Sequence, residues 1–140
     1  MENSRLPITQ FGLTPEDMDY CARLVLTGDK RATTAVLAAY AAEQEPLPCP
    51  GGRSLVRDGR GRGIAVIETT RVEIRRYHDV DEAFARIEGE GDKSLAFWQG
   101  VHWPFLVSEC SRLGLTATLQ TEVLLEYFDV VRPCLALEDF

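Results

Sequence analysis

The chain has 140 residues, of which 45% are apolar and 26% charged, and its net charge is −7. These values are typical of one folded domain, here residues 1–140, with a core of its own. The negative charge argues against a protein that coats nucleic acid through bulk electrostatics. We expect neither a membrane span nor a signal peptide, because no window is apolar enough and the N-terminus lacks the basic-then-apolar layout. The four cysteines form no CxxC pair, so we expect reduced thiols, no metal or other cofactor, and a cytoplasmic protein.

The first third of the chain predicts two helices. Thr14 and Pro15 suit the N-cap and first helical position, two acidic residues follow, and Gly28 suits the C-cap. Apolar residues at helical spacing between these ends indicate one buried face. A second helix, rich in alanine, is expected over residues 35–43 and stops before Pro46.

The middle of the chain and its C-terminal part predict strands. Residues 54–57, 63–70 and 72–77 are rich in β-branched side chains, and residues 58–61 supply a turn between the first two. Residues 122–131 alternate well enough for a long closing strand. Antiparallel strands with helices on either side predict an α+β fold, and closure into a small β-barrel would remove the exposed edges.

Two further helices are expected between these strands. A short helix near residues 80–87 has Asp79 or Asp81 as its N-cap. Residues 94–113 carry apolar side chains at helical spacing, and Pro104 is expected to kink this helix.

Charge is distributed unevenly along the chain. Residues 53–76 contain seven arginines and three acids, a net charge of +4, so the rest of the chain carries −11. This segment is either an anion-binding face on an acidic body or a solvated hairpin whose arginines keep its edges soluble.

The most informative segment is residues 89–98, in which two glycines flank Glu90 and a helix start follows. Glycine permits positive φ and close approach of the backbone to a partner. Asp92 is a suitable N-cap for the following helix. The segment is either a flexible approach to a helix cap or a site in which Glu90 is held on a bent loop beside a rigid helix.

A second candidate segment, residues 28–34, places a lysine and two hydroxyls after a helix end. Lys30 can serve as a charge for phosphate or, if desolvated, as a general base, and Thr33 could then act as a nucleophile. Local capping and solvation explain such residues as well. Together with Glu90, they form either a base, nucleophile and orienting acid or a set of hydrogen-bonding groups for a polar ligand.

The order of these segments resembles that of the ASCH domain family, which is similar to the PUA domain. After a helix followed by Gly-x-Lys and Thr come Ile-Glu-Thr-Thr at residues 67–70 and Glu-Gly-Glu-Gly-Asp-x-Ser-Leu-x-x-Trp at residues 88–98. His-Trp-x-Phe at residues 102–105 and Phe-Asp-Val-Val at residues 128–131 complete the pattern. The resemblance covers about residues 11–133, and the Glu-Gly-Glu-Gly-Asp-x-Ser-Leu-x-x-Trp segment is typical of one bacterial branch.

The resemblance implies a small β-barrel with flanking helices and a cleft that binds RNA or nucleotides, with ribonuclease activity in some members. A small relative hydrolyses acetylated cytidine, which implies an alternative function as an amidohydrolase with Lys30, Thr33 and Glu90 as a catalytic triad. Glu88 is an alternative to Glu90, because the match is too loose at this point to separate them. A non-catalytic protein-interaction module is a third possibility, and protein partners are not predicted. The candidate substrate-binding residues are Arg31, Thr34, Arg53, Glu88, Ser94, Trp98 and His102.

Some of the aromatic and basic residues need a closer interpretation. His102 shares a helix face with Trp98, where it is either a hydrogen-bonded core residue or a site residue. Trp98 and Trp103 could stack on a base, although their helical spacing favours core packing for Trp98. Arg53 departs from the family pattern and adds a positive charge near the expected mouth of the barrel.

Overall fold

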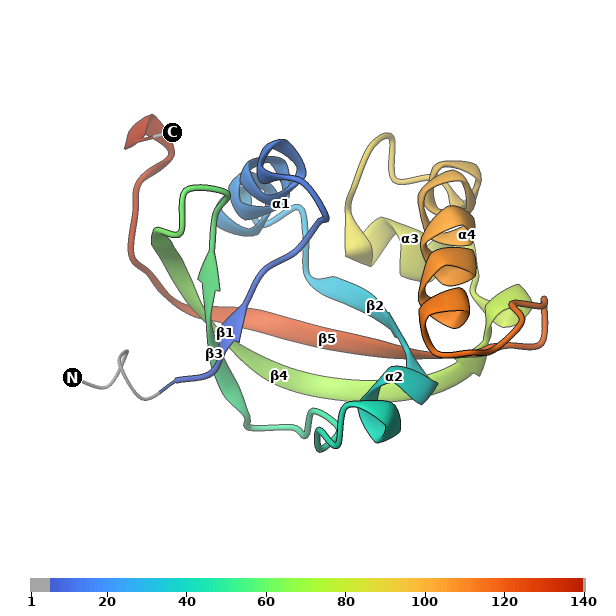
Figure 1. The fold of residues 1–140 in the computed structure, drawn as a ribbon. Helices are drawn as coiled ribbons and strands as arrows, with labels where there is room; N and C mark the ends of the chain where they lie inside the picture. The colour runs from blue at the N-terminus through green and yellow to red at the C-terminus, as the bar shows by residue number, and fades with distance from the viewer. Residues whose placement is uncertain (1–5, 140) are drawn as a thin grey trace.

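Five strands form one mixed sheet in the order β1-β3-β4-β5-β2. The computed structural model describes residues 6–139, and its long strands β4 and β5 curve beneath the helices (Figure 1). The β1–β3 pair is parallel and the other pairs are antiparallel. The predicted α+β class is therefore confirmed. The strands are β1 (Ile8–Thr9), β2 (Ala32–Val36), β3 (Arg53–Arg57), β4 (Gly63–Arg76) and β5 (Glu122–Pro133).

The sheet is open across the described residues. Its edge strands β1 and β2 do not pair with each other, so a closed barrel stays a prediction. The β4–β5 ladder contains two register shifts, between Val66 and Ile67 and between Thr69 and Arg71. Such bulges bend a strand and increase its twist, which accounts for the curvature of the long pair.

The helices lie over different parts of this sheet. Figure 1 shows α1 above one end, with α3 and α4 above the other. Within residues 6–139, no helix is both long and apolar enough to cross a membrane. The α-helices are α1 (Pro15–Thr27), α2 (Leu37–Ala42), α3 (Glu82–Glu88) and α4 (Leu95–Arg112), and the 3-10 helices are η2 (Tyr77–Asp79) and η3 (Leu137–Asp139).

Local capping fixes most helix ends where the sequence predicts them. Thr14 and Asp81 cap α1 and α3 through their side-chain oxygens, and Gly28 ends α1 with a φ of 92°. The prediction of Asp92 as the cap of α4 is wrong. Ser94 is the N-cap, while Asp92 accepts a hydrogen bond from the Ser94 backbone N–H at 2.9 Å. An Asx turn therefore precedes the cap.

Two other element predictions are also corrected by the structure. The helix expected over residues 35–43 begins only at Leu37, because residues 32–36 pair with β5 as strand β2. The strands expected over residues 63–70 and 72–77 are the single strand β4, which pairs with β5 across most of its length. Both differences arise from pairing with β5, a strand distant in sequence.

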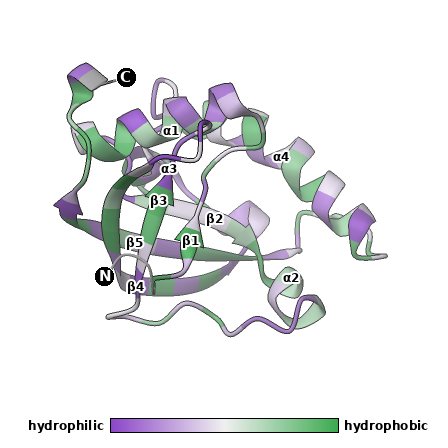
Figure 2. Cartoon of the chain, turned by 60° about the vertical axis from the view of Figure 1, so that its left-hand side comes forward, coloured by the Kyte–Doolittle hydropathy of each residue, from purple (hydrophilic) through white to green (hydrophobic). Residues whose placement is uncertain are grey.

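The sheet and helices enclose two apolar cores. Under α1, Val25 packs with Phe11 and Phe128, whose rings stack at 5.5 Å between centroids. Under α3 and α4, Phe84 and Trp98 belong to a separate cluster. Figure 2 shows hydrophobic and hydrophilic segments alternating along α1 and α4, as expected of helices with one buried face.

Candidate functional site

A cavity of about 530 Å³ lies between α1 and α4, where the two cores meet. Aromatic side chains contribute much of its lining: Phe11, Tyr20, Phe97 and Phe105. Its volume falls in the range typical of sites for small ligands. The polar groups on its wall therefore decide what it can bind.

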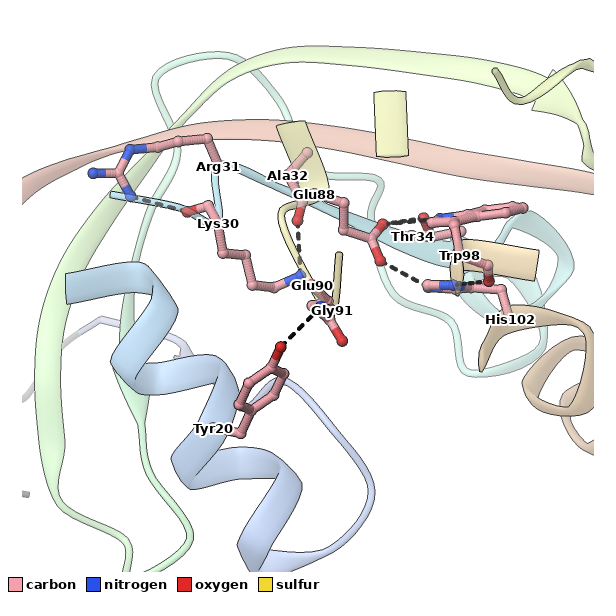
Figure 3. Close-up of polar contacts among 10 residues, drawn as sticks. All are labelled: Tyr20, Lys30, Arg31, Ala32, Thr34, Glu88, Glu90, Gly91, Trp98 and His102. Carbon is pink, nitrogen blue, oxygen red and sulfur yellow. Dashed lines mark hydrogen bonds and ion pairs between the residues drawn. The ribbon is translucent and has the colours of Figure 1, made fainter. Parts of the chain in front are cut away.

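Lys30 is the central cation of the cavity. It follows the C-terminal end of α1, and only 1% of its surface is exposed. Its Nζ donates hydrogen bonds to Oε2 of Glu90 at 2.8 Å and to the carbonyl of Ala32 at 2.9 Å (Figure 3). The same ammonium lies 5.1 Å from the centre of the Phe11 ring. A buried ammonium is stable only with such partners.

The end of α3 brings Glu90 to Lys30 through a close backbone contact. The Arg31 N–H donates to the carbonyl of Ile87 at 2.8 Å. Gly89 has a φ of +83°, and a Cβ there would lie 1.8 Å from the carbonyl oxygen of Asp29. Only glycine satisfies both the backbone conformation and the close approach. This contact joins distant segments of the chain, because Lys30 and Glu90 are 60 residues apart in sequence.

The loop that carries Glu90 is also fastened to α1. Gly91 donates its backbone N–H to the Tyr20 hydroxyl at 2.8 Å, and Lys93 pairs with Asp29 at 2.9 Å. Gly91 has a φ of 60°. The glycines on both sides of Glu90 thus hold the bend that turns its carboxylate toward Lys30.

Glu88 is the centre of a second buried cluster on the same cavity wall. Its Oε2 accepts from the Thr34 hydroxyl at 2.6 Å and from Trp98 Nε1 at 3.3 Å. Its Oε1 lies 2.9 Å from Nε2 of His102 (Figure 3). With 2% of its surface exposed, the carboxylate exchanges hydration for three protein donors.

Both clusters favour the charged forms of their members. Burial raises the pKa of Glu88, but the Lys30 charge and the His102 contacts outweigh it and lower this pKa to about 2. Burial lowers the pKa of Lys30, yet the carboxylates of Glu88 and Glu90 raise it above its ordinary value. Glu88 is therefore an anion and Lys30 a cation at neutral pH.

The contacts of His102 favour its imidazolium form. Its Nδ1 lies 2.9 Å from the carbonyl of Trp98, and its Nε2 lies 2.9 Å from the carboxylate of Glu88. Both partners accept hydrogen bonds, so the imidazolium form, with protons on both ring nitrogens, satisfies both contacts. Burial lowers the pKa of His102, but Glu88 more than compensates and raises it. The ring also stacks on Trp98, with 4.5 Å between centroids.

The three predicted catalytic residues all line this cavity, but only two are in contact. Lys30 and Glu90 form the ion pair, whereas the Thr33 hydroxyl makes no hydrogen bond within residues 6–139. The neighbouring hydroxyl of Thr34 is the one joined to an acid, Glu88. Both glutamates that the sequence left as alternatives line the cavity, with Glu88 buried and Glu90 19% exposed.

The other predicted substrate-binding residues have varied positions. His102 lines the cavity, whereas within residues 6–139 the lining includes none of Arg31, Arg53, Ser94 and Trp98. Trp98 is a core residue, and Ser94 caps α4. Arg31 donates to the carbonyls of Val25 and Lys30, and Arg53 pairs with Glu68 at 3.0 Å.

The arginine-rich segment lies apart from the cavity. Its turn packs against α1 where the Gly59 N–H donates to the Asp19 carboxylate at 2.8 Å. No arginine within residues 6–139 lines the cavity. Pairs with nearby acids occupy four of its seven arginines: Arg53–Glu68, Arg62–Asp58, Arg71–Glu73 and Arg75–Glu73.

The sequence interpretation did not identify the residues that α1 and its approach contribute. Phe11, Asp17, Tyr20 and Cys21 all line the cavity. The last three are spaced i, i+3 and i+4, which places them on one helix face. Of these three, only Cys21 belongs to the apolar spacing that predicted a buried face, and Asp17 and Tyr20 are exposed.

The open five-stranded sheet, with α1, α3 and α4 over it and a largely apolar cavity with a few charged groups between α1 and α4, defines an α+β domain with a ligand-sized site. A sequence profile of the ASCH domain matches residues 7–132, and the chain belongs to the ASCH domain family. The structure is similar to that of an ASCH domain from Lactobacillus crispatus JV V101, with 37% identity, a TM-score of 0.86, and coverage of 90% of this chain and 79% of that one. It is also similar to a protein from Enterococcus faecalis V583, with 30% identity, a TM-score of 0.83, and coverage of 94% and 83%. No curated protein matches this chain.

Proposed function

We propose that this protein binds the nucleoside part of its ligand in the cavity between α1 and α4, either as a free modified nucleoside or as a base of an RNA. The observation that carries the proposal is the buried Lys30–Glu90 pair inside a cavity of nucleoside size with aromatic walls. Membership of the ASCH domain family supports the same class of ligand.

The wall chemistry suits a planar ring with a polar edge. Lys30 has three N–H groups and uses two, on Glu90 and Ala32, so one donor is left for a ligand. Glu90 uses Oε2 for Lys30 and offers Oε1 as an acceptor. Tyr20 and Phe97 supply ring surfaces against which a base can stack. Polar groups of this kind fix the orientation of a ligand inside an apolar cavity.

The test is a panel of nucleosides, including acetylated cytidine, and short single-stranded RNAs, measured by thermal shift and calorimetry. A ligand present at 100 times its Kd stabilises the folded state by about 2.7 kcal/mol and raises Tm. Glu90→Gln removes the carboxylate while keeping the side-chain shape, and it should weaken binding about tenfold or more. Glu82→Gln, at an exposed position on α3, is the matched control and should bind like the wild type.

Lys30→Ala is informative only beside these variants, because it removes the cation beside the buried Glu88 and the partly exposed Glu90 and can unfold the protein. If no nucleoside or RNA shifts Tm, the proposal is refuted, and a protein-interaction module with an inert cavity becomes the better hypothesis.

A second candidate function is hydrolysis of an acylated nucleoside, favoured by the presence of Lys30, Thr33 and Glu90 in the lining of one cavity. The raised pKa of Lys30 opposes a role for it as a general base. In our proposal, Thr33 Oγ1 attacks the acyl carbon and its proton passes to Glu90, while the Lys30 ammonium stabilises the oxyanion. The C–N bond then breaks, the amine leaves with the proton from Glu90, and water releases the acid from threonine.

This reaction is tested by following the conversion of acetylated cytidine to cytidine and acetate. Thr33→Val should abolish turnover while ligand binding is retained, and Thr33→Ser should keep measurable turnover. Turnover by Thr33→Val at the wild-type rate would remove the threonine from the mechanism. Ribonuclease action has weaker support, because the lining cations Lys30 and His102 already pair with carboxylates.

A further inference from the structure

The charges that line the cavity give it a negative balance. Its ionisable carboxylates are those of Asp17, Glu88 and Glu90, and its cationic groups are Lys30 and His102. Even with His102 as an imidazolium, the lining carries one net negative charge. With His102 neutral, it carries two.

The cations of this lining are already neutralised. Lys30 lies 2.8 Å from Glu90, and His102 lies 2.9 Å from Glu88. Asp17 is left as a carboxylate that makes no ion pair within residues 6–139. A phosphate that entered would meet this carboxylate and Glu90 without meeting an unpaired cation, and like charges at such distances repel each other.

The outer part of the cavity is apolar. Leu13, Tyr20, Phe97 and Val101 line it, with exposed fractions of 73, 43, 38 and 41%. Exposed apolar side chains around a concave site mark a surface that a ligand covers. Apolar walls also strengthen the field of the inner charges.

We infer that the cavity is charge-selective: it admits an uncharged or cationic planar group and excludes a phosphate group from its interior. This inference rests on the proposed function for the identity of the ligand, but its electrostatic part concerns the cavity itself. If an RNA base enters, its phosphates lie outside the cavity.

The electrostatic part is tested without any ligand, by thiol labelling at the cavity mouth. Val101→Cys, in a chain with Cys49→Ser and Cys134→Ser, presents one exposed thiol on the lining. The rate at which this thiol reacts with a cationic methanethiosulfonate reagent is compared with its rate of reaction with an anionic one. The thiol of Cys21 also lines the cavity, but burial raises its pKa to about 12 and keeps it protonated and unreactive. Mass spectrometry counts the labels.

Cys49, an exposed thiol outside the lining, is the reference in a chain with Cys134→Ser. It corrects for the intrinsic reactivity of the reagents and for the overall charge of the protein. At low salt we expect the cationic-to-anionic rate ratio at position 101 to exceed that at Cys49 about tenfold. This excess should fall to within about twofold near 1 M salt, and Asp17→Asn should reduce it about threefold. Equal ratios at the two positions, or a lower ratio at position 101, would overturn the inference.

The ligand part compares each nucleoside that binds with its 5′-monophosphate by calorimetry. We expect the monophosphate to bind at least about tenfold more weakly, and Asp17→Asn to narrow the difference. A monophosphate that binds as tightly as its nucleoside overturns charge selectivity and leaves the proposed function standing. If no nucleoside binds, the proposed function fails, and the labelling ratio alone decides the electrostatic part.

Discussion

Replacing Glu88 with glutamine tests the assignment of buried charge in the site. The difference between the unfolded pKa of 4.5 and the folded pKa of about 2 corresponds to about 3 kcal/mol of stability at about 1.4 kcal/mol per pKa unit. Removing one partner of a buried ion pair costs a similar amount, about 3–5 kcal/mol. We therefore expect Glu88→Gln to lower the free energy of unfolding by about 3 kcal/mol at pH 7.

The pH dependence of this loss is the sharper part of the test. Because the folded pKa of Glu88 is depressed, its contribution is complete above about pH 4.5 and is lost as the pH falls toward 2. Glutamine does not titrate, so wild type and variant should converge in stability over that window. Urea unfolding at pH 7, 5, 4 and 3 measures the convergence. A difference that stays constant over this range, or one below about 1 kcal/mol at pH 7, would refute the assignment.

Glu126→Gln is a control with the opposite sign. Burial raises the pKa of Glu126, against a lowering by the hydrogen bond from Thr69. The ionised form of Glu126 is therefore unfavourable in the folded protein. The stability that protonated Glu126 contributes is present at low pH and is lost as the pH rises through the raised pKa of Glu126. We expect Glu126→Gln to be neutral or stabilising at pH 7, and less favourable relative to the wild type at pH 4.

Three further predictions concern the geometry around the cavity. Gly89→Ala should lower the free energy of unfolding by at least about 3 kcal/mol in urea unfolding, because the new Cβ meets the Asp29 carbonyl and φ is positive at this position. Gly100 lies inside a helix, and a Cβ there meets nothing within 4 Å, so Gly100→Ala should raise the free energy of unfolding by about 0.5–1 kcal/mol. Tyr20→Phe removes the acceptor for the Gly91 N–H and should cost at most about 1 kcal/mol, while weakening nucleoside binding through the loosened Glu90 loop. Nitrogen NMR should find both ring nitrogens of His102 protonated below pH 6.5. The stability that this charge contributes should be lost as the pH rises through the raised pKa of His102. A neutral ring at pH 6 would contradict the imidazolium assignment.

The parts of the fold that the sequence predicted correctly are set by local chemistry. The cap of α1 at Thr14 and its end at Gly28 depend on hydrogen bonds within a few residues, so the sequence contains them. Strand β2 was missed although Thr33, Thr34 and Val36 are β-branched, because the stretch is only five residues long and runs directly into an alanine-rich helix. It is a strand because each of its residues pairs with β5, about 90 residues further along the chain.

The same distinction applies to the site. Motif resemblance selected Lys30 and Glu90, and the structure brings them to 2.8 Å. The structural role of Glu88 was not predicted, because it depends on donors from β2 and α4 that only the fold brings together. The choice of Thr33 as nucleophile stays a prediction. Side chains alternate in direction along strand β2, and the hydroxyl that bonds to Glu88 is that of the neighbouring Thr34.

The position of the polar cluster couples stability to ligand binding. Lys30, Glu88 and Glu90 lie where the two apolar cores meet, and their hydrogen bonds join the end of α1, strand β2, the end of α3 and helix α4. Apolar residues of similar volume are often at least as stable as a buried ion pair, so burial of three charges does little for stability as such. What these charges do is hold four elements together around a cavity and keep a donor and an acceptor facing it. A ligand that shields Glu90 from Lys30 would lower the pKa of Lys30, because the Glu90 carboxylate helps to raise it. Ligand affinity and the protonation of Lys30 must therefore be linked.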